Sequence, residues 1–105
     1  MKYIVISTTT NKKVIADNIS NTLLKKKLSP CVQIKSNIIS NYIWNDKIKT
    51  DEEFSVQIKS ILKFKNEIID IIIKLHNYDI PEIISNDIYI LNNHYKTWYK
   101  ECLKK

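Results

Sequence analysis

The chain has 105 residues, a common length for one domain, and its 44% of hydrophobic residues is enough to form a core. Its net charge of +6 comes entirely from lysine, because the sequence contains neither arginine nor glycine. These absences exclude a glycine-rich phosphate loop and a bidentate guanidinium clamp, and no apolar run approaches the roughly 20 residues of a membrane span. We therefore expect residues 1–105 to form one soluble, cytoplasmic domain.

The first elements are a strand and a helix. Residues 2–8 are rich in β-branched residues and apolar on both faces, which is typical of a central strand. Residues 8–11 offer several helix N-caps, and Pro30 offers a stop signal. Between them a helix over about 12–28 is predicted by apolar residues three or four positions apart: Ile15, Ile19 and Leu23.

A long hairpin is predicted over residues 30–60, with Asn45-Asp46 as its turn. Each arm is about twice as long as a typical strand of roughly 5–6 residues. Asn37 marks a candidate bulge, because asparagine tolerates a left-handed backbone. The even positions of the first arm are mostly apolar: Val32, Ile34, Ile38, Tyr42 and Trp44. So small a domain cannot cover such a hairpin, so we expect an oligomer.

The C-terminal half is expected to hold a helix over about 61–76, a polar loop over 76–82, a strand over about 83–91 and a helix over about 94–103. Asn92 or Asn93 is the candidate cap of the last helix. The resulting order is β-α-β-β-α-β plus a C-terminal helix. This order predicts an α+β, ferredoxin-like split β-α-β fold, with two helices on one face of an antiparallel sheet.

Candidate chemistry is sparse in this sequence. His76 could ligate a metal together with Cys31 and Glu82, but their spacing does not require it, and a loop histidine is the simpler interpretation. No nucleophile signature is present, so we expect no catalytic residue and no enzyme. The aromatic residues Tyr42, Trp44, Tyr95, Trp98 and Tyr99 are not accompanied by the glycine-containing signature of an RNA-recognition domain, which favours core or subunit contacts over nucleic-acid binding.

Three segments together resemble the CutA family, whose members are also called divalent-cation tolerance proteins. The first is residues 23–32, LLKKKLSPCV, and the second is the hairpin with its Ser-x-Tyr-x-Trp stretch at 40–44. The third and most specific is the His-x-Tyr-x-x-Pro-Glu pattern at 76–82. Tyr95 and Trp98 also match the family's last helix. The similarity covers almost the whole chain in the right order.

Four positions depart from the family pattern. Asn37 and Asp46 stand where the family usually has glycine, and both residue types can keep the required backbone conformation. Ser7 stands where some bacterial members have a cysteine implicated in copper binding. Leu75 replaces one of two adjacent histidines of those members, so only His76 remains of that pair.

The resemblance implies a homotrimer whose hairpin arms pair with neighbouring subunits, and a non-enzymatic role in tolerance of divalent metals, copper especially. It implies no obligatory cofactor, and His76 and Glu82 would be the metal ligands. The trimer would resemble PII signalling proteins, so an alternative function is the binding of a small effector in clefts between subunits. We expect no nucleic-acid or membrane partner. The expected cleft or interface residues are Tyr42, Trp44, Glu53, Lys59, Tyr78 and Trp98.

Overall fold

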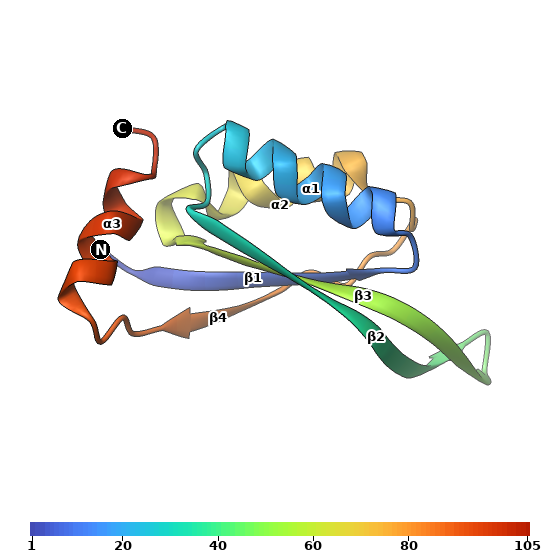
Figure 1. Cartoon of the computed structure of the whole chain (residues 1–105). Coiled ribbons are helices and arrows are strands. Elements are labelled where there is room, and N and C mark those ends of the chain that lie inside the picture. The colour runs from blue at the N-terminus through green and yellow to red at the C-terminus, as the bar shows by residue number, and fades with distance from the viewer.

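The computed structural model describes residues 1–105 and has four strands in one sheet, with two helices on one face (Figure 1). A third helix lies at the end of the molecule opposite the hairpin tip. The elements are β1 (Tyr3–Thr10), α1 (Lys13–Lys25), β2 (Cys31–Trp44), β3 (Lys47–Ile61), a 3₁₀ turn (Leu62–Phe64), α2 (Lys65–Leu75), β4 (Ile84–Ile88) and α3 (Asn93–Glu101). The predicted order of elements is confirmed.

The sheet has the strand order β2-β3-β1-β4, and each neighbouring pair is antiparallel. The central strands β1 and β3 pair over their shared length, with Ile6 opposite Ile58. The side chains that β1 and β3 direct toward the helices pack with those of α1 and α2 in a single core. Its fully buried members include Ile4, Ile6, Ile19, Leu23, Val56, Ile58, Ile68 and Ile72.

The bulge predicted at Asn37 is confirmed, and it changes the face of the sheet to which the even-numbered side chains of the first arm point. Asn37 has a φ of 62°, and the register of β2 against β3 shifts between Lys35 and Ile38. Before the bulge, Val32 pairs with the buried Ile58 and faces the helices. The inserted residue reverses the alternation, because side chains point to opposite faces with a period of two. Simple alternation suggested that the even positions of the first arm share one face. Because of the bulge, those before Asn37 and those after it lie on opposite faces.

The predicted turn at Asn45-Asp46 is also confirmed, with φ values of 51° and 61°. Both values are left-handed, as a two-residue hairpin turn of type I′ requires. The tip of the hairpin extends beyond the ends of α1 and α2 (Figure 1). Ile43 and Ile48 pair with each other there and are 75% and 81% exposed.

Helix α1 differs from its prediction at both ends. Residues 8–10 belong to β1, and Lys12 occupies the N-cap position without a side-chain hydrogen bond. At the other end, Lys27 has a φ of 57°, and its amide and that of Leu28 bond back to Leu24 and Leu23, each at 3.0 Å. This Schellman motif ends α1 at Lys25, well before Pro30, and leaves only Lys25 in the last turn.

Two later elements are shorter than predicted. The strand β3 continues to Ile61, and a 3₁₀ turn precedes α2, so this helix begins at Lys65 and not at residue 61. The strand β4 ends at Ile88 because Ile88 pairs with Tyr3, the first residue of β1, and no partner strand lies beyond it. Asn92 is confirmed as the cap of α3, where its side chain accepts a hydrogen bond from the Tyr95 amide.

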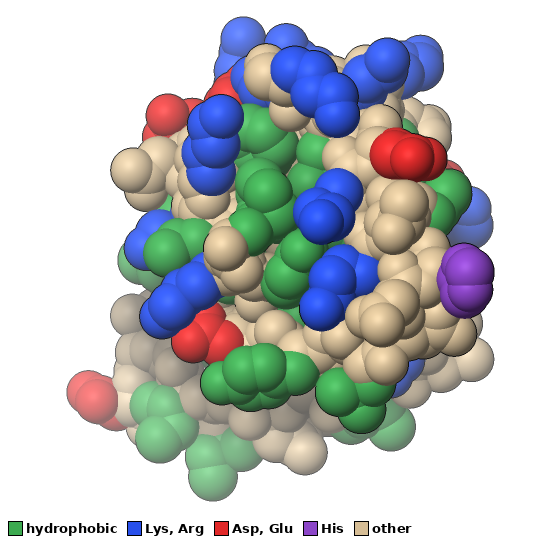
Figure 2. Space-filling model, turned by 90° about the vertical axis from the view of Figure 1, so that its left-hand side faces the viewer, with side chains coloured by type: hydrophobic (Ala, Val, Ile, Leu, Met, Phe, Trp, Pro, Cys, Tyr) green, Lys and Arg blue, Asp and Glu red, His purple; other side chains and the backbone are tan.

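Helix α3 is anchored by one buried residue. Tyr99 is fully buried, and its hydroxyl donates a 2.6 Å hydrogen bond to the Ser60 carbonyl at the end of β3. Trp98 remains 43% exposed. At this end of the molecule, lysine side chains surround exposed apolar side chains (Figure 2). None of the helices combines the length and the apolar character needed to cross a membrane.

Candidate functional site

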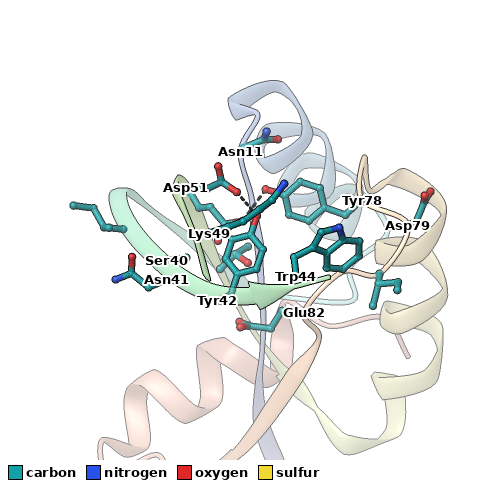
Figure 3. Close-up of a pocket in the computed structure, with 14 residues that line it drawn as sticks. Asn11, Ser40, Asn41, Tyr42, Trp44, Lys49, Asp51, Tyr78, Asp79 and Glu82 are labelled. Atoms are coloured by element: carbon teal, nitrogen blue, oxygen red, sulfur yellow. Dashed lines mark hydrogen bonds between the residues drawn. The ribbon is translucent and has the colours of Figure 1, made fainter. Parts of the chain in front are cut away.

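A pocket of about 680 Å³ lies between the outer part of the β2–β3 hairpin and the loop that follows α2 (Figure 3). We call it the hairpin pocket. It is lined by Thr9, Asn11, Ile39, Ser40, Asn41, Tyr42, Trp44, Lys49, Asp51, Glu53, Tyr78, Asp79, Ile80 and Glu82. The bulge at Asn37 creates this lining, because it turns Tyr42 and Trp44 to the face opposite α1 and α2.

Three aromatic side chains surround the centre of the pocket. Tyr42 and Trp44 come from β2, and Tyr78 comes from the loop after α2 (Figure 3). Tyr42 pairs across the hairpin with Lys49, and Ser40 pairs with Asp51. Charged side chains of β3 and aromatic side chains of β2 thus lie next to each other on one face of the hairpin.

The most deeply buried charged residue of the pocket is Glu53, which is 7% exposed. Its Oε2 accepts a 2.7 Å hydrogen bond from the Tyr78 hydroxyl. Burial raises the pKa of the Tyr78 hydroxyl, and the hydrogen bond to the Glu53 carboxylate and its charge raise this pKa further. Tyr78 is therefore held as a protonated hydrogen-bond donor.

A second tyrosine–carboxylate pair stands at the pocket wall. The Tyr42 hydroxyl donates to Oδ2 of Asp51, and this hydrogen bond is the main cause of the raised pKa of Tyr42. Burial and the negative charges of Asp51 and Glu53 raise this pKa further. Both tyrosine hydroxyls thus stay protonated and donate to carboxylates of the pocket.

The loop after α2 is held to the end of β1 by side chains of residues 76 and 77. His76 Nε2 lies 2.9 Å from the Thr9 carbonyl, and His76 Nδ1 accepts a 3.0 Å hydrogen bond from the Tyr78 amide. These partners assign the proton of the neutral ring to Nε2. Asn77 joins the same strand end by accepting a 2.7 Å hydrogen bond from the Thr10 hydroxyl.

The environment of His76 favours the neutral imidazole. Burial lowers the pKa of His76, although its hydrogen bond to the Thr9 carbonyl and the charge of Glu53 act in the opposite direction. The two expected metal ligands lie differently: Glu82 lines the hairpin pocket, whereas His76 does not. The structure has no group of three or more histidine, cysteine, aspartate or glutamate side chains arranged to hold a metal ion.

The residues expected at a cleft fall into two sets. Tyr42, Trp44, Glu53 and Tyr78 come together in the hairpin pocket. Lys59 pairs with Val5 and Cys31 in the sheet and does not line the pocket. Trp98 lies on α3, at the opposite end of the molecule (Figure 1). One chain therefore does not bring all the expected cleft residues together.

Sequence reasoning missed several pocket residues, and a signal for two of them was present. Lys49 and Asp51 line the pocket beside Tyr42 and Ser40. Counting outward from the Asn45-Asp46 turn pairs these residues directly, because a two-residue hairpin loop determines the register. Asp79 and Ile80 lie in an irregular loop, for which no comparable periodic signal exists.

Comparison with known proteins agrees with this architecture. Residues 4–102 match the family model of the CutA1 divalent ion tolerance protein. The divalent-cation tolerance protein CutA of Pyrococcus horikoshii is 32% identical over 102 residues, which cover 97% of this chain and 99% of that protein. Protein CutA 1, chloroplastic, of Oryza sativa is 29% identical and covers 97% of this chain, which spans 58% of that longer protein.

A solved structure shows the same arrangement. The divalent ion tolerance protein CutA1 from Ehrlichia chaffeensis superposes with a TM-score of 0.89 at 35% identity, covering 97% of this chain and 96% of that one. The fold is thus that of the CutA1 structures, an α+β fold with a four-stranded antiparallel sheet and three helices. The chain belongs to the CutA family of divalent-cation tolerance proteins.

Proposed function

We propose that this chain is a homotrimeric, non-enzymatic protein that contributes to tolerance of divalent metal ions, copper in particular, in the cytoplasm. The observation that carries the trimer is the uncovered hairpin, whose apolar side chains Ile39, Ile43 and Ile48 are 69%, 75% and 81% exposed. Several strongly exposed isoleucines on one hairpin with unpaired edges are typical of a surface that another chain covers.

A closed trimer joins two different surfaces of each subunit, because its contacts are heterologous. The molecule has two suitable ends, the hairpin and the region of β4 and α3 (Figure 1). At the second end Tyr89 and Leu91 are 87% and 92% exposed, and Trp98 is 43% exposed. The charges of the ends are complementary: residues 40–53 and 76–82 carry six carboxylates and two lysines, whereas residues 89–105 carry four lysines and one carboxylate.

The molar mass in solution tests this assembly. Size-exclusion chromatography with light scattering is expected to give three times the 12.4 kDa mass of the chain. A double substitution, Ile43→Lys and Ile48→Lys, is expected to lower the mass toward that of the monomer. The matched control is Val14→Lys, which places a charge at a 59% exposed apolar position of α1. A monomeric wild type would refute the trimer.

Metal binding by this chain is proposed to be weak, with His76 and Glu82 as ligands. Both ring nitrogens of His76 already have partners, so coordination through Nδ1 would replace the hydrogen bond from the Tyr78 amide. The lack of a group of three ligating side chains within one chain also agrees with weak binding or with ligands supplied by a neighbouring subunit.

Calorimetric titration with copper tests these ligands. The wild type is expected to bind, and His76→Ala and Glu82→Gln are each expected to weaken binding severalfold. The control His94→Ala removes the only other histidine of the chain. Identical isotherms for the wild type and His76→Ala would remove His76 from the proposed site.

The protonated state of the two pocket tyrosines supports a binding role and not a catalytic one. Its two hydrogen-bonded tyrosines have raised pKa values, which makes them poor bases and poor nucleophiles. Both cysteines are free, which suits a reducing compartment such as the cytoplasm.

The hairpin pocket favours a second candidate function, the binding of a small effector as in PII-like trimers. A pocket of about 680 Å³ has the size typical of small-molecule sites, and it combines aromatic walls with a few polar groups. A thermal-shift screen with nucleotides, anionic metabolites and amines tests this function, because a ligand that binds only the native state raises its stability. Absence of any shift at high ligand concentration would refute it.

A further inference from the structure

We infer that the hairpin pocket binds an organic cation, an aliphatic amine whose ammonium groups face the carboxylates and whose carbon chain lies against the aromatic rings. This inference rests on the second candidate function above and specifies its ligand class. It starts from an asymmetry of charge. The whole chain carries +6, yet four of its eleven carboxylates line this one pocket, together with a single lysine.

The pocket carboxylates have no cationic partner within the chain. The two ion pairs of the structure join Lys13 to Asp17 and Lys104 to Glu67, both outside the pocket. Glu53 is the clearest case: its Oε2 accepts from Tyr78, whereas its Oε1 makes no hydrogen bond within the chain and keeps some exposure, although the residue as a whole is only 7% exposed. A carboxylate oxygen that faces a pocket and has no counter-charge within its own chain is a binding point for an ammonium group, because charge-assisted hydrogen bonds are the strong ones.

The aromatic side chains identify the cation as organic. Tyr42, Trp44 and Tyr78 surround the centre of the pocket, and Glu82 approaches them from the side of β4 (Figure 3). Aromatic faces attract ammonium groups and also cover an apolar carbon chain. By contrast, no three carboxylates lie close enough together to enclose one metal ion. Separated carboxylates between aromatic rings suit a ligand with more than one ammonium group along a chain.

Lys49 distinguishes a cationic ligand from an anionic one. It is the only basic residue of the lining, and its ammonium has no ion pair in the structure. For an organic cation Lys49 is a repulsive charge, whereas for an anionic effector it would be the main attraction. Removal of this one charge should therefore change the affinity in opposite directions for the two classes of ligand.

The test is calorimetric titration of the full chain at low ionic strength with 1,5-diaminopentane, 1,5-pentanediol and ATP as probes. The diamine is expected to bind and the uncharged diol of the same length is not. Glu82→Gln should weaken the diamine about three- to tenfold, and Lys49→Gln should tighten it by a similar factor, as expected for one charge in a partly solvated site. The matched controls are Glu52→Gln and Lys47→Gln, which change charge on the same strand outside the pocket and should leave the affinity unchanged.

Each other outcome counts against the inference in a distinct way. Equal binding of the diol would show that the charge is not recognised, and equal effects of Glu82→Gln and Glu52→Gln would show general electrostatic attraction and no site. Binding of ATP that Lys49→Gln weakens would keep the effector site but refute its cationic ligand. Binding of no probe would refute both. Thermal melts of each variant establish that it is folded.

Discussion

The Tyr78 hydroxyl donates a 2.7 Å hydrogen bond to Oε2 of Glu53, and this contact joins the loop after α2 to β3 across 25 positions of sequence. It places an aromatic ring from the loop opposite the two aromatic residues of β2 (Figure 3). The same contact supplies the only hydrogen bond of a carboxylate that is more than nine-tenths buried. The shape of the hairpin pocket therefore depends on this pair.

Loss of this hydrogen bond should destabilise the protein measurably. Tyr78→Phe leaves the Glu53 carboxylate buried without its donor, and we expect a loss of about 1–3 kcal/mol in the free energy of unfolding. Urea denaturation at fixed protein concentration measures it, since the stability of an oligomer depends on concentration. Equal stabilities of Tyr78→Phe and the wild type would contradict the assigned role.

Two threonines of β1 should respond in opposite ways to the same substitution. Thr8 is fully buried and its hydroxyl has no hydrogen-bond partner, so Thr8→Val is expected to stabilise the protein by about 1 kcal/mol. The Thr10 hydroxyl donates to Asn77 and accepts from the Lys12 amide. Thr10→Val is therefore expected to cost about 1–2 kcal/mol. Thermal and urea denaturation of the pair measure both changes, and destabilisation by Thr8→Val would contradict the first.

The left-handed residue that ends α1 offers a stabilising substitution. Lys27 has a φ of 57°, a conformation that glycine adopts without steric cost. Lys27→Gly is expected to raise stability by about 0.5–1 kcal/mol, after allowing for the greater freedom of glycine in the unfolded chain. The neighbouring Lys26→Gly serves as the control, because Lys26 is right-handed with a φ of −80° and should lose stability. The same sign for both substitutions would argue against the Schellman motif.

The lowered pKa of His76 predicts a dependence of stability on pH. Burial keeps the folded-state pKa below the unfolded value of about 6.5, so the unfolded chain takes up the proton more readily. Stability should fall as the pH drops through about 6.5 and should stop falling, for this group, below the folded-state pKa. Urea denaturation between pH 7.5 and 5.5 in EDTA tests this. His76→Gln should reduce the slope and His94→Gln should not.

Much of the fold was predictable because it depends on local patterns. Period-two and period-3.6 spacing of apolar and aromatic residues indicated the strands and helices, and the left-handed conformations of Asn37, Asn45 and Asp46 were predictable without any glycine in the chain. The end of α1 was missed because lysine carries no signal for a left-handed cap. The end of β4 was missed because Tyr3 limits it from another strand, and no local pattern records that limit.

The candidate site was predictable only in part, for a related reason. The family motifs supplied Tyr42, Trp44, Glu53, Tyr78 and Glu82, which all line the hairpin pocket. His76 was expected beside them as a ligand, but hydrogen bonds to β1 and to its own loop occupy both ring nitrogens. Whether such a side chain is free to bind depends on the atoms around it, and residue type alone does not specify them.

The sequence by itself determined the order of the elements, the hairpin with its turn and bulge, and the resemblance to one family, because each follows from spacing along the chain. Only the tertiary structure decided that Tyr42 and Trp44 lie on the face of the sheet opposite the helices. It also placed the loop after α2 against these residues. It further decided that the acidic and aromatic residues of the hairpin pocket come together at the end of the molecule opposite α3 (Figure 1). The physical reason is that contacts between distant segments depend on strand register and on the packing of helices against the sheet.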